Sequence, residues 1–212
     1  MSPHQDIALK PRKRPVQTRS EATVAALLEA SIQVLLAVGY RKLTTTRVAE
    51  RAGVSVGTLY QYFPNREALI TSVIEDYLED IAALVAQSCQ DLAGRPLDEL
   101  ATGLVDAFIA AKWQRIELSR AVHEPLVDVG GAELVRATAG RSADFVADIL
   151  QSCSDADFRD VHQLALLVVM ACSSLLQAAI TDPTKSIDVE ALRAHMRAMV
   201  LGYLREMRAP AA

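Results

Sequence analysis

The stretch LTTTRVAERAGVSVGTLYQYF, residues 43–63, decides the fold of the N-terminal third of the chain. It predicts two short helices joined by a tight turn at Gly53, where a positive φ is easily adopted only by glycine. Thr44 or Thr45 is expected to cap the first helix and Ser55 the second, because a hydroxyl there accepts a hydrogen bond from the first turn. Side chains at the spacing of a buried helix contact are Val48, Ala49, Ala52, Val54, Leu59 and Tyr62. Such a helix-turn-helix places its second helix in the major groove of DNA.

Two further helices flank this unit. Thr18 and Glu21 have the capping-box spacing, so a first helix is expected from about Arg19, ending at Gly39 as a left-handed C-cap. Asn65 is expected to cap a long helix that runs to about Gln90. We interpret residues 1–17, with three prolines, as a flexible basic arm. Its cations are either DNA contacts or part of a solubilising tail: Lys10, Arg12, Lys13 and Arg14.

Charge is distributed unevenly along the 212 residues. Residues 1–66 carry ten Lys and Arg against four acids, a net charge of +6, whereas the remainder carries −10 and the whole chain −4. This asymmetry is expected of a basic DNA-binding region attached to a body that phosphate repels.

The remaining periodic segments are all helical, and no stretch alternates with period two, so the fold class is all-α. Asp155, Asp157 and Asp160 are interpreted as an acidic helix N-terminus. His123 and Glu124, beside Pro125, are expected to follow Trp113 across a short irregular link. The expected helices are Leu97 to Trp113 or further, Ala132 to Gln151, Ala156 to Ile180, and Ile187 to Met207.

The most apolar run, Leu164 to Ile180, falls short of the ~20 residues that span a bilayer. We expect it to be a buried or interfacial helix. The basic N-terminus has no apolar signal segment, so we predict a soluble, cytoplasmic protein without a membrane partner. Cys89, Cys153 and Cys172 form no pair or metal motif, and buried thiols are favoured over a redox switch.

Motifs of catalysis are missing from the sequence. It contains no Ser-His-Asp arrangement with a recognisable nucleophile turn, and no HExxH motif, phosphate-binding glycine loop or dinucleotide fingerprint, and its four histidines are scattered. We therefore predict that the chain is not an enzyme, and that it has no catalytic residues, cofactor or metal.

The first 70 residues resemble the DNA-binding region of the TetR family of transcriptional regulators. The resemblance follows, in order, Gly39-Tyr40, Leu43–Thr45, Val48–Ser55, Gly57–Phe63 and Asn65–Leu69. It implies an all-helical homodimer, with a three-helix DNA-binding domain over residues 18–66 and a helical effector-binding and dimerisation domain over 67–212.

DNA contacts are expected from both helices of the motif. Val56, Gly57, Thr58 and Gln61 would face the groove, where Val56 meets a thymine methyl and Gln61 an adenine or a phosphate. The resemblance implies phosphate contacts for Tyr60 and Arg66; Tyr62 is either a phosphate contact or partly core. The remaining candidates are Thr45, Thr46 and Arg47 at the start of the first helix, and the cap Ser55.

Residues of the C-terminal region are assigned more broadly. We predict an apolar cavity that binds an effector. The candidate lining residues are Phe108, Trp113, His123, Phe145 and Met170. Each of them, taken alone, is more typical of an ordinary core or surface position. The resemblance favours dimerisation through the last two helices over burial within the subunit, and the candidates are Leu164, Leu167, Val168, Ala171, Leu175, Met196, Met199 and Tyr203.

These observations predict a repressor that binds a pseudo-palindromic DNA operator as a homodimer and is released by a small, mainly hydrophobic effector. The long helix from Arg66 to about Gln90 is expected to transmit the effector response. The alternative is an activator, or a regulator controlled by a protein partner, which the sequence does not distinguish from a repressor.

Overall fold

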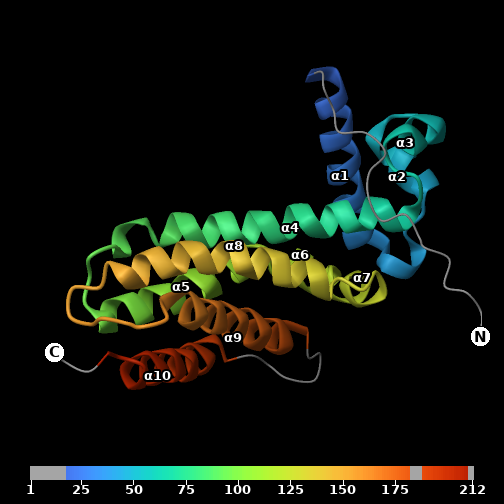
Figure 1. Cartoon of the computed structure of the whole chain (residues 1–212). Coiled ribbons are helices and arrows are strands. Elements are labelled where there is room, and N and C mark those ends of the chain that lie inside the picture. Colours follow the sequence, from blue (N-terminus) through green and yellow to red (C-terminus); the bar gives the residue numbers. More distant parts are fainter. Residues whose placement is uncertain (1–17, 182–187, 210–212) are drawn as a thin grey trace, which may run out of the picture. The chain divides into compact units, whose positions relative to one another are not determined.

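The computed structural model describes residues 18–181 and 188–209, which form helices and turns without a strand; Phe158 and Arg208 make one isolated bridge. The all-α prediction is confirmed. The α-helices are labelled in Figure 1. In chain order they are α1 (Thr18–Val38), η1 (Tyr40–Lys42), α2 (Thr45–Ala52), α3 (Val56–Tyr62), α4 (Arg66–Ser88), η2 (Gln90–Leu92), α5 (Leu97–Gln114), α6 (Ile116–Ala121), α7 (His123–Asp128), α8 (Ala132–Gln151), α9 (Val161–Thr181) and α10 (Val189–Glu206).

The chain forms two compact units. The first comprises the residues up to Tyr77 together with Ala121–Ala132, and the second comprises Leu78–Arg120 and the residues from Glu133 onward. Helix α4 begins in the first unit and continues into the second. The first unit includes the start of α4, up to Tyr77, and helix α7, both of which lie outside the predicted DNA-binding domain 18–66. The predicted basic arm, with Lys10, Arg12, Lys13 and Arg14, lies outside the described residues.

The first unit has a core in which α1 packs on α2 and α2 on α3. Leu27 of α1, Val48 of α2 and Leu59 of α3 are completely buried. Ala49 is also completely buried, as expected of a residue at a helix crossing where a larger side chain would separate the helices. Ala52, Val54 and Tyr62, predicted to be core, are half-buried.

The helix ends in this unit follow local sequence signals. The Thr44 hydroxyl accepts a hydrogen bond from the Arg47 amide at 3.3 Å, and the Asn65 side chain accepts one from the Ala68 amide at 2.7 Å. Gly53 has the predicted left-handed conformation, with φ 68° and ψ 29°. Gly39 differs from its prediction: its φ is 78° but its ψ is 165°, which is a glycine-specific conformation outside the left-handed helical region.

The segment between Trp113 and His123, predicted as an irregular link, contains the short helix α6, and a second short helix, α7, begins at His123. Pro125 lies in the first turn of α7, where its missing amide hydrogen is not needed by the helix. Each helix is only six residues long, so neither displays the apolar repeat from which helices are recognised in a sequence.

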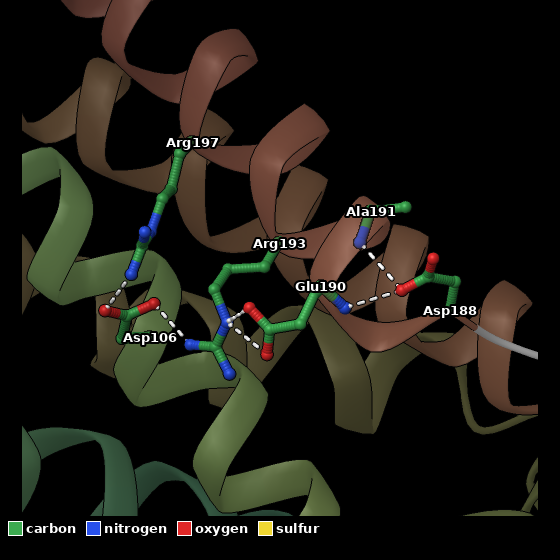
Figure 2. Close-up of polar contacts among 6 residues, drawn as sticks. All are labelled: Asp106, Asp188, Glu190, Ala191, Arg193 and Arg197. Carbon is green, nitrogen blue, oxygen red and sulfur yellow. Dashed lines mark hydrogen bonds and ion pairs between the residues drawn. The ribbon is translucent and has the colours of Figure 1, made fainter.

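The second unit contains α5, α8, α9 and α10, and α10 packs most extensively on α5. Figure 2 shows the main polar link between them: Asp106 of α5 receives Arg193 at 2.6 Å and Arg197 at 2.5 Å from α10. Arg205 pairs with Asp98 at 2.6 Å further along the same two helices. Asp188 caps α10 by accepting from the amides of Glu190 and Ala191.

Helix α9 begins at Val161 rather than at Ala156, so the predicted start is wrong. Asp155 does not belong to the N-terminus of α9: its carboxylate accepts a hydrogen bond from the Leu97 amide at 2.8 Å and thereby caps α5. This contact lowers the pKa of Asp155. Asp160 does cap α9, through the Gln163 amide.

The helix that contains the apolar run is longer than the run itself: α9 extends over 21 residues, which is long enough to span a bilayer. By length and composition alone, Val161–Thr181 and Ser20–Val38 of α1 are both able to cross a membrane. The core helix of a soluble protein passes the same test, and Leu164, Val168, Cys172 and Leu176 of α9 are buried inside the second unit.

The three cysteines are all free thiols. Burial raises the pKa of Cys89 to about 11 and that of Cys172 to about 12. Because the thiolate is the reactive form, these environments disfavour redox chemistry at both residues. This supports the interpretation of Cys89 and Cys172 as packing residues.

Candidate nucleic-acid interface and effector region

The outward face of α3 consists of Gly57, Tyr60 and Gln61, all of which are exposed. Their spacing of three and four residues puts them on one side of the helix. A Cβ built on Gly57 would meet only the Ser55 Oγ, at 3.7 Å. The fold therefore has room for a side chain at Gly57, and its absence leaves the backbone of the first turn accessible to a ligand.

The first turn of α3 is held by its cap. The Ser55 hydroxyl accepts from the Thr58 amide at 3.0 Å and lies 2.8 Å from the Thr58 Oγ1. The Ser55 cap prediction is therefore confirmed. Thr58 and Val56 are half-buried, which places them beside the exposed face rather than at its centre.

A hydrogen bond joins the two helices of the motif at the surface. The Thr45 Oγ1 lies 3.2 Å from the Tyr60 hydroxyl, so the start of α2 is adjacent to the outward face of α3. Thr46 and Arg47 in the same turn of α2 are exposed, and the Arg47 guanidinium donates to the Lys42 carbonyl at 2.8 Å. The structure thus brings these predicted contact residues onto one continuous surface.

Tyr62 lies toward α1. It is half-buried, and its hydroxyl accepts a hydrogen bond from Ser20 at 3.4 Å. The sequence left Tyr62 as either a phosphate contact or a partly buried core residue. This position favours the second role, as a packing residue between α3 and α1.

Arg66 has a different environment from the one that the resemblance implied. Its guanidinium lies over the Tyr40 ring, 4.1 Å from the centroid, and donates to the Tyr40 carbonyl at 2.8 Å. Its Nε is buried. Arg66 is therefore committed to packing against η1, and we do not retain it among the proposed phosphate contacts.

Two polar contacts join η1 to α7 within the first unit, and sequence reasoning missed both. The Tyr40 hydroxyl donates to Asp128 at 2.5 Å, and Arg41 pairs with Glu124 at 2.8 Å. Burial and the Asp128 hydrogen bond raise the pKa of Tyr40 to about 12. Residues separated by more than 80 positions meet here, so no local pattern signals the contact.

The five predicted effector residues do not share one environment. Phe108 is buried, and Trp113 and Phe145 are half-buried, all in the second unit. Met170 is exposed on α9, while His123 is exposed on α7 and belongs to the first unit. The exposed positions of His123 and Met170 do not fit the predicted interior cavity.

The predicted dimer residues divide into three groups by their burial within the subunit. Leu164, Val168 and Met196 are buried within the subunit, so for these three the alternative of internal packing is correct. Ala171 and Tyr203 are half-buried. On α9 and α10, the large apolar side chains that the subunit leaves exposed are Leu167, Met170 and Leu175 of α9 and Met199 of α10.

Comparison with protein families gives two matches that together cover most of the chain. Residues 27–73 match the model described as bacterial regulatory proteins of the tetR family. Residues 96–204, more than half of the chain, match the model described as the tetracyclin repressor-like C-terminal domain.

Curated relatives match mainly in the N-terminal region. An uncharacterized HTH-type transcriptional regulator of Mycobacterium tuberculosis is 37% identical over 87 residues, which cover 39% of this chain and 45% of that protein. The HTH-type transcriptional repressor KstR of Mycolicibacterium smegmatis is 40% identical over 57 residues, 27% of this chain and 28% of KstR. The match thus spans less than half the length of either relative.

Solved structures share the fold over nearly the whole chain. The fatty acid degradation regulator FadR of Bacillus halodurans superimposes with a TM-score of 0.64 at 18% identity, covering 92% of this chain and 99% of FadR. A TetR-family regulator of Streptomyces coelicolor gives 0.59 at 21% identity, covering 87% and 99%. These structures show the shared fold. The two family matches show that the chain is a DNA-binding transcriptional regulator and that it belongs to the TetR family.

Proposed function

We propose that the chain is a repressor that binds a pseudo-palindromic DNA operator as a homodimer and releases it when a small molecule binds the second unit. The observation that carries the proposal is the single surface formed by Gly57, Tyr60 and Gln61 of α3 with Thr45–Arg47 of α2. An exposed helix face beside helix N-terminal hydroxyls and an arginine fits a major groove and its flanking phosphates.

Repression is favoured over activation by one comparison. KstR, which is 40% identical over 57 residues, is named a repressor. Occupying the operator is sufficient for repression, whereas activation would need an additional surface for the transcription machinery. Bacterial DNA lies in the cytoplasm, so we also propose a cytoplasmic location for the protein.

Dimerisation is assigned to α9 and α10. Leu167, Met170 and Leu175 are exposed along α9 and Met199 is exposed on α10. Large apolar side chains gathered on neighbouring exposed helix faces are typical of protein–protein interfaces. A two-fold dimer would present two copies of α3, which explains the expected inverted repeat.

The response to an effector is assigned to both α4 and α7. Helix α4 is continuous between the two units. Helix α7 follows α6 directly and is bonded to η1 through Asp128 and Glu124. An effector that changes the equilibrium conformation of the second unit would act on the DNA-binding unit through these two connections.

Selection of genomic DNA fragments by the purified protein tests the proposal. We expect enrichment of an inverted repeat, with two chains bound per site in sedimentation or native mass spectrometry. A reporter assay with and without the gene then separates repression from activation. Failure to enrich a symmetric element would overturn operator binding by a dimer, and reduced expression on deletion would overturn repression.

A further inference from the structure

Arg41 of η1 is a surface arginine that an acid of a distant segment neutralises. Its side chain is 88% exposed, and its Nε donates to the Glu124 Oε1 of α7 at 2.8 Å. A guanidinium carries donors on Nε and on both Nη atoms, and this bond uses the Nε donor. The Nη edge of Arg41 therefore stays available to a second anionic acceptor, although Glu124 cancels its charge.

Two more cations lie beside Arg41, where the chain enters α2. Lys42 is the next residue, and its carbonyl accepts a hydrogen bond from the Arg47 guanidinium at 2.8 Å. All three side chains are exposed, and no acid in the described part of the chain forms an ion pair with Lys42 or Arg47. We call these three residues the basic strip. The amides and the dipole at the start of α2 favour the same anions, so a phosphate is the natural ligand of this surface.

Glu124 reaches Arg41 because α7 is held against η1 at two successive residues. Glu124 and Asp128 are four positions apart, which puts them on one face of α7. Their partners Arg41 and Tyr40 are adjacent in η1, and the Tyr40 hydroxyl donates to Asp128 at 2.5 Å. The Tyr40 hydrogen bond thus keeps the Glu124 carboxylate within reach of the Arg41 guanidinium.

A DNA phosphate and the Glu124 carboxylate are alternative partners for the same cation. Both are anions that accept charge-assisted hydrogen bonds from a guanidinium. While Glu124 is paired with Arg41, it cancels the attraction of Arg41 for phosphate and adds its own repulsion. Because an exposed ion pair contributes little free energy, a nearby phosphate is able to displace the carboxylate.

We propose that Arg41 is a DNA phosphate contact that Glu124 masks, so that α7 competes with DNA for this side chain. The inference rests on the proposed docking of α2 and α3 on DNA, and it adds a residue and a direction to the proposed effector response. Docking of α7 on η1 lowers the affinity for DNA. By linkage, DNA bound at Arg41 favours release of Glu124 to the same extent.

Neutralising Glu124 tests the masking directly. Glu124→Gln keeps the size of the side chain and removes its charge. Binding of the full-length protein to a fluorescein-labelled DNA duplex of arbitrary sequence is followed by anisotropy at several salt concentrations, because phosphate contacts do not depend on sequence. We expect the affinity at low salt to rise about threefold or more. The slope of log affinity against log salt should steepen by up to about one for each chain bound.

A double-variant cycle assigns the gain to Arg41. Arg41→Met removes the guanidinium, so in that background Glu124→Gln should leave the affinity for the duplex unchanged. Glu133→Gln is the matched control: it removes the same charge from an exposed acid of α8 that pairs with Arg136 in the second unit, and it should not alter DNA binding. Circular dichroism and urea denaturation verify the fold of each variant.

The inference is overturned if Glu124→Gln does not raise the affinity, or if it raises the affinity equally in the Arg41→Met background, since the carboxylate would then act by general repulsion of DNA. Arg47→Ala in the same assay keeps this result distinct from the proposed DNA surface. Weaker binding by Arg47→Ala without a gain from Glu124→Gln would support that surface and refute the masking. A gain that requires Arg41, without a loss from Arg47→Ala, would support the masking and refute the Arg47 contact.

Discussion

The hydroxyl of Tyr40 donates a hydrogen bond to the carboxylate of Asp128, and this contact closes a loop of 88 residues within the first unit. Tyr40 lies in the short η1 helix before the helix-turn-helix, and Asp128 ends α7. The same tyrosine ring also supports Arg66 at the start of α4. Tyr40 therefore contacts both α4 and α7. These are the two helices next to the points where the chain passes between the first and second units.

Removing the Tyr40 hydroxyl should destabilise the first unit. We expect Tyr40→Phe to lower the free energy of unfolding by about 1–2 kcal/mol, because a half-buried hydrogen bond to a charged group is lost. Asp128→Ala should have a similar effect, and the double variant should cost little more than either alone. Urea denaturation measures all three; fully additive losses would show that the two residues are not coupled.

Gly57→Ala separates folding from DNA binding. A methyl group at this position meets only ordinary contact with Ser55, and alanine is the better helix former by up to about 1 kcal/mol. The variant should therefore be at least as stable as the wild type but bind the selected DNA about tenfold more weakly, if the backbone approaches the groove here. Gly140→Ala in α8, where a Cβ also finds open space, is the control with unchanged DNA affinity.

Arg47→Ala should reduce both the affinity for DNA and its salt dependence. If Arg47 contacts a phosphate, the slope of log affinity against log salt falls by about one. Fluorescence anisotropy at several salt concentrations measures this slope. Arg136→Ala, which removes an exposed arginine of α8 paired with Glu133, should leave it unchanged. Equal slopes for Arg47→Ala and wild type would exclude the phosphate contact.

Leu167→Glu should convert the protein to a monomer. Leu167 is 45% exposed in the subunit, and a carboxylate buried there in a dimer would lack a compensating charge. Sedimentation velocity measures the change, and Val127→Glu, at a 70% exposed position in the first unit, is the matched control. A dimer that persists in Leu167→Glu would move the interface away from this face of α9.

The burial of Lys112 predicts a specific dependence of stability on pH. The pKa of Lys112 is about 8 in the folded chain and about 10.5 in the unfolded chain, so the unfolded chain holds the extra proton between these values. Wild-type stability should therefore rise, relative to Lys112→Met, as the pH increases from about 8 to about 10.5, by roughly 3 kcal/mol. Parallel pH profiles of urea denaturation measure the difference; superimposable profiles would contradict it.

Local signals explain why much of the fold was predictable. Thr44, Ser55 and Asn65 each bond to an amide three residues ahead, so their capping roles are encoded within one turn of sequence. The start of α9 was mispredicted because Asp155 is used by α5, 58 residues earlier in the chain. A helix-capping residue identifies a helix end only when its partner is local.

The candidate site was less predictable because its distinctive features depend on tertiary contacts. Arg66 matches a family pattern, but its guanidinium is engaged by Tyr40. Lys112 follows two alanines, and its burial comes from the packing of α5, which the local sequence does not reveal. For the same reason, periodicity marked Leu164 and Leu167 as one apolar face, although the fold buries the first and exposes the second.

The ion pairs between α5 and α10 restrict which foreign helix can replace α10 in a chimaeric protein. Asp98 and Asp106 are eight residues apart, and so are their partners Arg205 and Arg197, which run in the opposite direction. Sliding one helix by a single turn, about 5.4 Å, would separate both pairs together. A chimaera that receives a foreign α10 therefore needs arginines at this spacing, or it must receive a matching α5 with it.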